Sequence, residues 1–232
     1  MMTIRHSQDR GQTKLGWLDS RHTFSFGGYR DSAHDGFGML RVINEDWISG
    51  GGGFAPHDHR DMEIVTYLVE GALQHKDSTG GGGTIRPGEI QRMSAGSGIT
   101  HSEFNASSER TAHLLQIWIV PSKNGLAPSY EQKTIVADDV RNMFARIAAP
   151  DPQPNEVRLV QDAQIWAAKF DKGIDATHRL AKNRRAWLQV VKGELTLGDA
   201  TLHAGDAAAI TDEDEIRLRS AAPSEVLLFD LA

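Results

Sequence analysis

The chain has no cysteine among its 232 residues. Disulfides, thiolate zinc sites and cysteine nucleophiles are therefore excluded. A chain without disulfides is at home in a reducing compartment, and the first thirty residues lack the cationic and then apolar pattern of a signal peptide. No apolar run approaches the roughly 20 residues that a membrane-spanning helix needs. We therefore expect a cytoplasmic protein without a membrane anchor.

The chain also lacks an excess of positive charge, since 31 acidic residues outnumber 25 basic ones and the isoelectric point is about 5.9. Sequence-independent binding of nucleic acid needs clustered Lys and Arg side chains that replace phosphate counterions. The most basic stretch, Arg179 to Arg185, is short and precedes a strand-like run, so we interpret it as a solvated edge. We therefore expect no direct contact with nucleic acid.

Helical periodicity is rare along the chain. Short runs rich in Val, Ile, Leu, Tyr and Trp alternate instead with glycine turns, which is typical of β-strands. Four such runs are Glu63 to Val69, His113 to Val120, Trp187 to Val191 and Glu225 to Leu231. The sequence therefore predicts an all-β fold.

The two halves of the chain repeat one pattern. TYLVEGALQH, RPGEIQRM and HLLQIWIV in the first half correspond to LQVVKGELTL, HAGDAAAI and EVLLFDLA in the second. Aligning Gly71 with Gly193 and Gly88 with Gly205 predicts two small β-barrels, which close their own sheet edges. We expect the first domain over residues 1–135, a linker over 136–155 and the second domain over 156–232. The linker combines a loosely helical segment, Asp138 to Ala149, with a proline-rich one.

Two histidine-containing pairs carry the chemistry. His57 and His59 are two positions apart, and so are His101 and Glu103. Positions two apart on a strand point to the same face, so two strands could bring four ligand-type side chains to one point. Three imidazoles and one carboxylate suit Fe(II), Mn(II), Ni(II) or Zn(II) rather than calcium or magnesium. A lone histidine is usually a core or surface residue, so the pairing and the glycine-framed context carry the interpretation.

The motifs resemble those of the cupin superfamily. Gly51, His57, His59, Glu63 and Gly71 resemble the first cupin motif, with one extra residue before the last glycine. Pro87, Gly88, Gly98, His101 and Asn105 resemble the second. Within the cupins the chain resembles the pirin family in GWLDSRHTFSF, LRVINED, PHDHRDMEIVTYLVEG, MSAGSGITHSE, QIWI and SYEQ.

The pirin resemblance implies two cupin barrels, of the jelly-roll or double-stranded β-helix type, with one metal in the first. The implied ligands are His57, His59, His101 and Glu103, and iron(II) is the implied metal, with nickel, manganese and zinc left open. Many cupins use instead the glutamate of the first motif, here Glu63, for which a hydrogen bond to a ligand histidine is the alternative. His75 and His113 are interpreted as satisfied core or surface histidines, and a contact of either one with a ligand histidine is the alternative.

The repeat also predicts where a second metal would lie. The alignment puts Arg179 and Ala181 opposite His57 and His59, and puts Leu218 and Ser220 opposite His101 and Glu103. His178 is one residue out of phase in this alignment, which would turn it to the other face. We therefore expect a second domain without metal ligands.

The resemblance implies an oxidoreductase of the quercetin 2,3-dioxygenase type. Such an enzyme opens a flavonol ring with O2 and releases carbon monoxide, and Glu103 would act as the catalytic base that accepts the 3-hydroxyl proton. Two alternatives stay open, namely a metal- or redox-sensing regulator that binds a protein partner, and a cupin isomerase or hydrolase. Nothing indicates a large exposed apolar face, so a monomer is expected. The candidate rings for the substrate walls, each of which could instead fill the core, are Phe24, Phe26, Phe37, Phe54 and Trp118.

Overall fold

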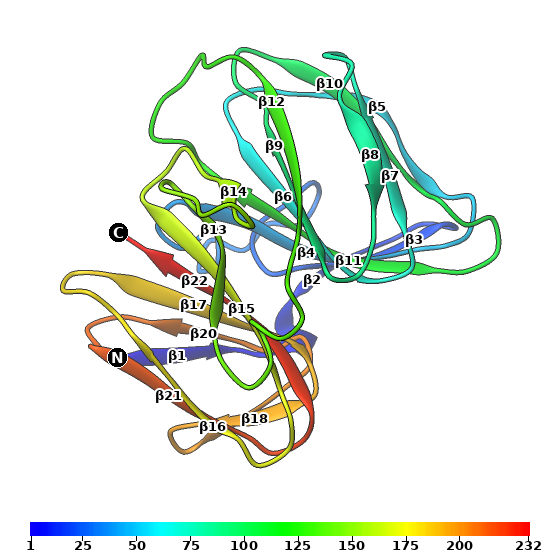
Figure 1. The fold of residues 1–232 in the computed structure, drawn as a ribbon. Coiled ribbons are helices and arrows are strands. Elements are labelled where there is room, and N and C mark those ends of the chain that lie inside the picture. The colour runs from blue at the N-terminus through cyan, green and yellow to red at the C-terminus, as the bar shows by residue number, and fades with distance from the viewer. The chain divides into compact units, whose positions relative to one another are not determined.

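The computed structural model describes residues 1–232 and is almost entirely β (Figure 1). Its one helix is a single 3-10 turn, Ser7–Asp9, so no helix is long and apolar enough to cross a bilayer. The chain divides into two compact units. We name residues 11–134 and 157–161 the N-terminal unit, and residues 1–10, 135–156 and 162–232 the C-terminal unit.

The N-terminal unit contains two antiparallel sheets. One has seven strands in the order β12-β9-β6-β11-β4-β3-β2, and the other has four in the order β5-β10-β7-β8. The strands of this unit are β2 (Gly11–Lys14), β3 (Leu18–His22), β4 (Leu40–Ile48), β5 (Gly53–His59), β6 (Glu63–Glu70), β7 (Leu73–Asp77), β8 (Gly82–Ile85), β9 (Glu89–Ser94), β10 (Ile99–Asn105), β11 (Ala112–Ile119), β12 (Ser129–Thr134) and β14 (Val157–Arg158).

The C-terminal unit repeats this plan. Its large sheet contains the order β1-β20-β17-β22-β15-β13, and its small sheet has the order β16-β21-β18-β19. The strands are β1 (Met2–Arg5), β13 (Ala145–Ala149), β15 (Ala163–Phe170), β16 (Asp175–Arg179), β17 (Arg185–Lys192), β18 (Glu194–Leu197), β19 (Ala200–His203), β20 (Ala207–Ile210), β21 (Glu215–Ser220) and β22 (Ser224–Leu231). The two-barrel cupin architecture is confirmed, because β9-β6-β11-β4 and β20-β17-β22-β15 are equivalent.

Each unit encloses its own hydrophobic core between its two sheets. In the N-terminal unit Leu73 and Ile85 of the small sheet pack against Ile48, Leu68 and Leu114 of the large one. The alternation of the strands explains this arrangement, since every second side chain points inward. A cluster of the same kind in the C-terminal unit joins its small-sheet strands β18, β19 and β21 to β17 and β22 of its large sheet. Each core therefore holds its own barrel together and positions its small sheet.

The unit boundaries differ from the predicted domains at three places. Residues 1–10 belong to the C-terminal unit, because β1 pairs with β20 through Met2 to Arg5. The predicted linker is also part of that unit, because β13 pairs with β15. Residues 157–161, predicted to begin the second domain, belong instead to the N-terminal unit. The expected helical character of Asp138 to Ala149 is wrong, since the segment forms turns and then strand β13.

The turn glycines of the repeat provide a test of stability. Gly193 has φ +82°, and a Cβ atom there would lie 2.1 Å from the Pro223 carbonyl oxygen. We expect Gly193→Ala to lower the free energy of unfolding by about 3 kcal/mol, because left-handed strain and a backbone clash add. Gly88→Ala is the matched control, since Gly88 has φ +85° in open space, and should cost only about 1 kcal/mol. Equal losses in denaturant unfolding would contradict this account.

Candidate metal centre

Three histidines meet on the small sheet of the N-terminal unit. His57 and His59 come from β5 and His101 from the neighbouring β10, where His101 pairs with His57 in the antiparallel register. Their imidazole rings lie with centroids 4.4–4.8 Å apart. The ligand nitrogens of this set all lie within 4.8 Å of one another. The two-residue spacing therefore brings the three side chains together as the sequence predicts.

The orientation of the imidazoles suits a metal ion. The Nε2 atoms of His57 and His101 lie 3.0 Å apart, and two ligands at right angles, each about 2.1 Å from one ion, would be about 3 Å apart. Nδ1 of His57 donates a hydrogen bond to the Ala55 carbonyl oxygen at 2.9 Å. Because that nitrogen carries the hydrogen, the lone pair of Nε2 faces the other imidazoles. The donor set therefore fits a divalent ion.

Glu103 lies beside this set and is 2 % exposed. Its carboxylate groups with His75 and His101 rather than with His57 and His59. Gln116 Nε2 donates to its Oε2 at 2.7 Å, and Thr66 Oγ1 lies 3.5 Å from Oε1. Burial and the nearby charge of Asp46 raise the pKa of Glu103 to about 7, although both hydrogen bonds oppose the shift. A cation here would strongly favour the ionised carboxylate.

Burial has the opposite effect on two of the histidines. It lowers the pKa of His59 to about 4, and the neighbouring His57 adds to the shift. It lowers the pKa of His101 to about 2, with further contributions from His57 and His59. Both imidazoles are therefore neutral near pH 7, which is the form that binds a metal.

A pocket of about 460 Å³ opens over these residues. Phe26, Phe54 and Trp118 line it, whereas Phe24 is buried in the core and Phe37 lies outside the lining. The sequence reasoning missed further lining residues, namely Thr13, Leu15, Trp17, Leu18, Ser20, His22, Gly27, Gly28, Asn44, Asp46 and Gln116. These residues lie on β2, β3, β4 and β11 or in the loops that follow β2 and β3, and the pairing of these strands cannot be read from the sequence. The pocket therefore has aromatic side chains on one part of its lining and the three histidines with Glu103 on another.

Asp46 is the second buried carboxyl of this pocket. It is 2 % exposed, and no protein atom forms a hydrogen bond with its Oδ1. Burial raises its pKa to about 6, against the effect of a hydrogen bond from Ser20. Asp46 and Glu103 line the same pocket, and two buried carboxylates so close repel each other when both are ionised. A bound cation would relieve that repulsion, so the pocket favours one.

Three other predicted positions have structural roles. Glu63 accepts hydrogen bonds from Ser94 Oγ and the Val160 N–H, so the suggested bond to a ligand histidine is wrong. Asn105 donates to the Ile48 and Arg110 carbonyl oxygens and ends its strand in a turn. His113 contacts Glu45 and stacks on Trp47.

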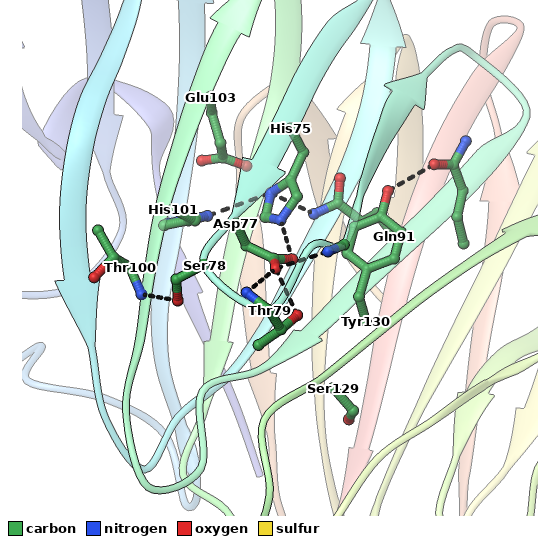
Figure 2. Close-up of polar contacts among 12 residues, drawn as sticks. His75, Asp77, Ser78, Thr79, Gln91, Thr100, His101, Glu103, Ser129 and Tyr130 are labelled. Carbon is green, nitrogen blue, oxygen red and sulfur yellow. Dashed lines mark hydrogen bonds and ion pairs between the residues drawn. The ribbon is translucent and has the colours of Figure 1, made fainter.

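His75 contacts His101, which the sequence left open as the alternative to a core or surface role. Its Nδ1 lies 3.3 Å from Nδ1 of His101, and its Nε2 lies 3.1 Å from the Asp77 carboxylate (Figure 2). Burial lowers the pKa of His75 against the effect of Asp77. Burial would raise the pKa of Asp77, but hydrogen bonds from Thr79, His75 and Gly81 hold it below its usual value. Asp77 is therefore an ionised carboxylate next to a neutral His75.

The second barrel has no equivalent ligand set, but the alignment that predicted this was out of register. His75 and Leu197 are equivalent, because each lies four positions after its turn glycine, Gly71 or Gly193. Glu103 pairs with His75 and Leu218 pairs with Leu197, so Leu218 is the equivalent of Glu103. His178 pairs with Ile216 as His57 pairs with His101. The positions of His57, His59, His101 and Glu103 are therefore held by His178, Leu180, Ile216 and Leu218. His178 is in phase, and it is the one ligand-type side chain at these four positions.

A pocket of about 720 Å³ in the C-terminal unit contains this histidine. His178 Nε2 lies 3.5 Å from Asp230 Oδ2, and Arg184 binds the same carboxylate. Trp166 and Phe144 meet the imidazole edge-on. This pocket is larger than that of the N-terminal unit, so the donor atoms rather than the volume identify the candidate metal centre.

Comparison with known proteins agrees with both halves of the repeat. The family model described as Pirin matches residues 3–119, and the model described as the quercetinase C-terminal cupin domain matches residues 146–231. The quercetin 2,3-dioxygenase of Escherichia coli K12 is 44% identical over 231 residues, covering 100% of this chain and 99% of that protein. The crystal structure of YhhW from Escherichia coli superposes with a TM-score of 0.96 at 44% identity, covering 100% and 98% of the two chains. A structure of the bacterial pirin YhhW from the same organism in complex with nickel(II) gives 0.94 at 43% identity, covering 100% and 99%.

Proposed function

The chain belongs to the pirin family, and we propose that it is a metal-dependent dioxygenase that opens flavonols with O2. The observation that carries the proposal is the pocket in which Phe26, Phe54 and Trp118 stand over three converging imidazoles and a buried carboxyl. The relative named quercetin 2,3-dioxygenase and the pirin complex with nickel(II) support a divalent metal and a flavonol substrate. Our proposed ligands are His57, His59, His101 and Glu103, with one metal per chain.

The proposal gives each group of the pocket its own role in the reaction. A divalent ion, for which we propose iron(II), would act as a Lewis acid and as a site for O2. The aromatic walls would hold the planar rings and exclude water, as apolar pockets do for aromatic ligands. Glu103 would accept the proton of the 3-hydroxyl group, and Gln116 holds the carboxylate in place through its hydrogen bond. The overall reaction joins one O2 to the flavonol and releases carbon monoxide, leaving a depside ester.

The test uses the metal-free protein loaded anaerobically with iron(II), nickel(II) or manganese(II). Quercetin and oxygen are then added, and the flavonol absorbance and the released carbon monoxide are followed together. The matched control substrate is luteolin, the flavone that lacks only the 3-hydroxyl group. We expect equal amounts of flavonol lost and carbon monoxide released, and no reaction with luteolin.

One result of this experiment would reject the proposed reaction. Full metal binding without loss of flavonol or release of carbon monoxide, for all three metals, would reject flavonol cleavage. A redox-sensing role with a protein partner would then be the better account of the same metal centre.

A further inference from the structure

Two fully buried polar side chains behind the histidines have no part in the proposed reaction. His75 and Asp77 lie on β7, which pairs with β10 so that His75 is opposite Glu103 and Asp77 is opposite His101. Both side chains are 0% exposed. Buried polar groups are costly unless hydrogen-bonded, so their contacts define what they do.

These side chains are linked by successive polar contacts, from Asp77 through His75 to His101. The Asp77 carboxylate lies 3.1 Å from Nε2 of His75, and Nδ1 of His75 lies 3.3 Å from Nδ1 of His101 (Figure 2). The other nitrogen of His101, Nε2, lies 3.0 Å from Nε2 of His57. One imidazole therefore contacts the candidate metal centre on one side and the buried pair on the other.

Asp77 can serve only as an acceptor towards His75. Its Oδ1 accepts hydrogen bonds from the Thr79 N–H, the Thr79 hydroxyl and the Gly81 N–H, at 2.9, 2.6 and 3.0 Å. Its Oδ2 is left for Nε2 of His75, which must then carry the hydrogen. A neutral imidazole has only one N–H, so Nδ1 of His75 is an acceptor. Gln91 Nε2, 3.3 Å away, donates to the same atom.

We propose that His75 and Asp77 are positioning residues that make Nε2 of His101 the metal-binding atom. Nδ1 of His75 carries no hydrogen, so Nδ1 of His101 is the donor in their contact and shares the one lone pair of His75 with Gln91 Nε2. The lone pair of His101 is then fixed on Nε2, towards His57 and His59. The inference rests on the proposed metal centre. Partners of this kind orient metal-binding histidines through their second nitrogen.

Asp77→Asn tests the proposal because it should reverse the direction of the hydrogen bonds from Asp77 through His75 to His101, while a side chain of nearly the same shape remains. The amide oxygen would take the place of Oδ1, since three donors converge there, and the NH2 group would face His75. Nε2 of His75 would become an acceptor, and Nδ1 would carry the hydrogen towards His101. The lone pair of His101 would then be drawn to Nδ1, away from the centre, as a wrong tautomer.

Two measurements are made on the full-length protein. Nitrogen-15 NMR of the imidazoles reports which nitrogen carries the hydrogen in the metal-free protein and with zinc(II), the diamagnetic probe. Competition with a chromophoric chelator gives the zinc affinity, which we expect Asp77→Asn to lower by about 10- to 100-fold. Asp58→Asn is the matched control, because Asp58 lies between His57 and His59 but its carboxylate binds Thr100. It should change the affinity by no more than about threefold, because the charge of Asp58 acts on His59 but is exposed and screened by solvent.

The wild-type spectrum decides the inference even if the variant fails to fold. Hydrogen on Nε2 of His75 and Nδ1 of His101 supports it, and hydrogen on Nδ1 of His75 overturns it. An unchanged zinc affinity in folded Asp77→Asn also overturns it, as do two zinc ions per chain with His75 as a ligand. Failure of the wild type to bind any divalent metal would reject the metal centre itself, and the metal-free spectrum would still show whether the hydrogen-bond chain exists.

Discussion

Replacement of His57 by alanine is expected to abolish stoichiometric metal binding and to lower flavonol turnover by about a thousandfold or more. A metal ion contributes several kcal/mol to the stabilisation of developing charge, and each 1.4 kcal/mol is about tenfold in rate. His57 supplies one of three converging nitrogens, and its Nε2 lies 3.0 Å from that of His101. With two imidazoles left, the ion would lose a ligand and its fixed geometry. Metal content per chain and carbon monoxide release are the two measurements.

His57 suits this experiment better than His101 because it is only partly buried. His101 is 2 % exposed, so its loss would leave a cavity and would confuse unfolding with loss of the metal. The control is His113→Ala, since His113 binds Glu45 and stacks on Trp47 outside the pocket lining. It should retain both metal and turnover. A His57→Ala protein that binds a full equivalent of metal with the wild-type affinity would remove His57 from the ligand set.

The strands and the histidine pairs could be predicted because they depend on local spacing. Alternation along a strand places His57 beside His59, and His101 beside Glu103, in any sheet. The pairing of β5 with β10, which brings the two pairs together, is a long-range fact. In the sequence it was available only through the resemblance to the cupins.

Glu63 shows where counting in steps of two fails. The sequence gives it the same parity as His57 and His59, but a turn separates β5 from β6, and Asp61 in that turn has φ 48°. A residue in the left-handed region changes the chain direction, so parity does not carry across it. Glu63 consequently binds Ser94 and the Val160 N–H instead of a ligand histidine.

The sequence left a contact of His75 with a ligand histidine open, but Asp77 was missed although it stands two positions from His75, the same spacing as in the ligand pairs. Their strand follows the Gly71 turn directly, so the signal could have been found by treating β7 as a possible neighbour of β10. The second copy was misaligned for a related reason. The alignment was anchored at two glycines, but His178 lies before the first of them and Ile216 after the second. Chain-length differences outside the two glycines shifted the count there, and only strand pairing shows that His178 corresponds to His57.

Glu103→Gln is expected to lower turnover by about 10²- to 10⁴-fold, which is the usual contribution of a positioned general base. The amide has nearly the shape of the carboxylate, so Gln116 and Thr66 keep a partner at that position. It cannot accept the proton of the 3-hydroxyl group, and it is a weaker, neutral ligand. Steady-state turnover at saturating metal separates the loss of the base from the loss of the ion. Turnover within a few-fold of wild type would show that another group accepts the proton.

The same variant should weaken the pH dependence of metal binding and leave the smaller part that the charge of Asp46, with a pKa of about 6, contributes. Burial, with Asp46 adding to it, raises the pKa of Glu103 from 4.5 to about 7, so the folded metal-free protein holds a proton that the unfolded chain loses. The raised pKa of Glu103 therefore stabilises the folded metal-free protein fully below about pH 4.5, and this contribution is lost as the pH rises to about 7. An ion must displace that proton, so the affinity should rise about tenfold per pH unit between pH 5 and 7 and then level off. The pKa values of His59 and His101, about 4 and 2, leave both neutral in this range. Chelator competition at several pH values measures the slope, and an undiminished slope in Glu103→Gln would assign the displaced proton to another group.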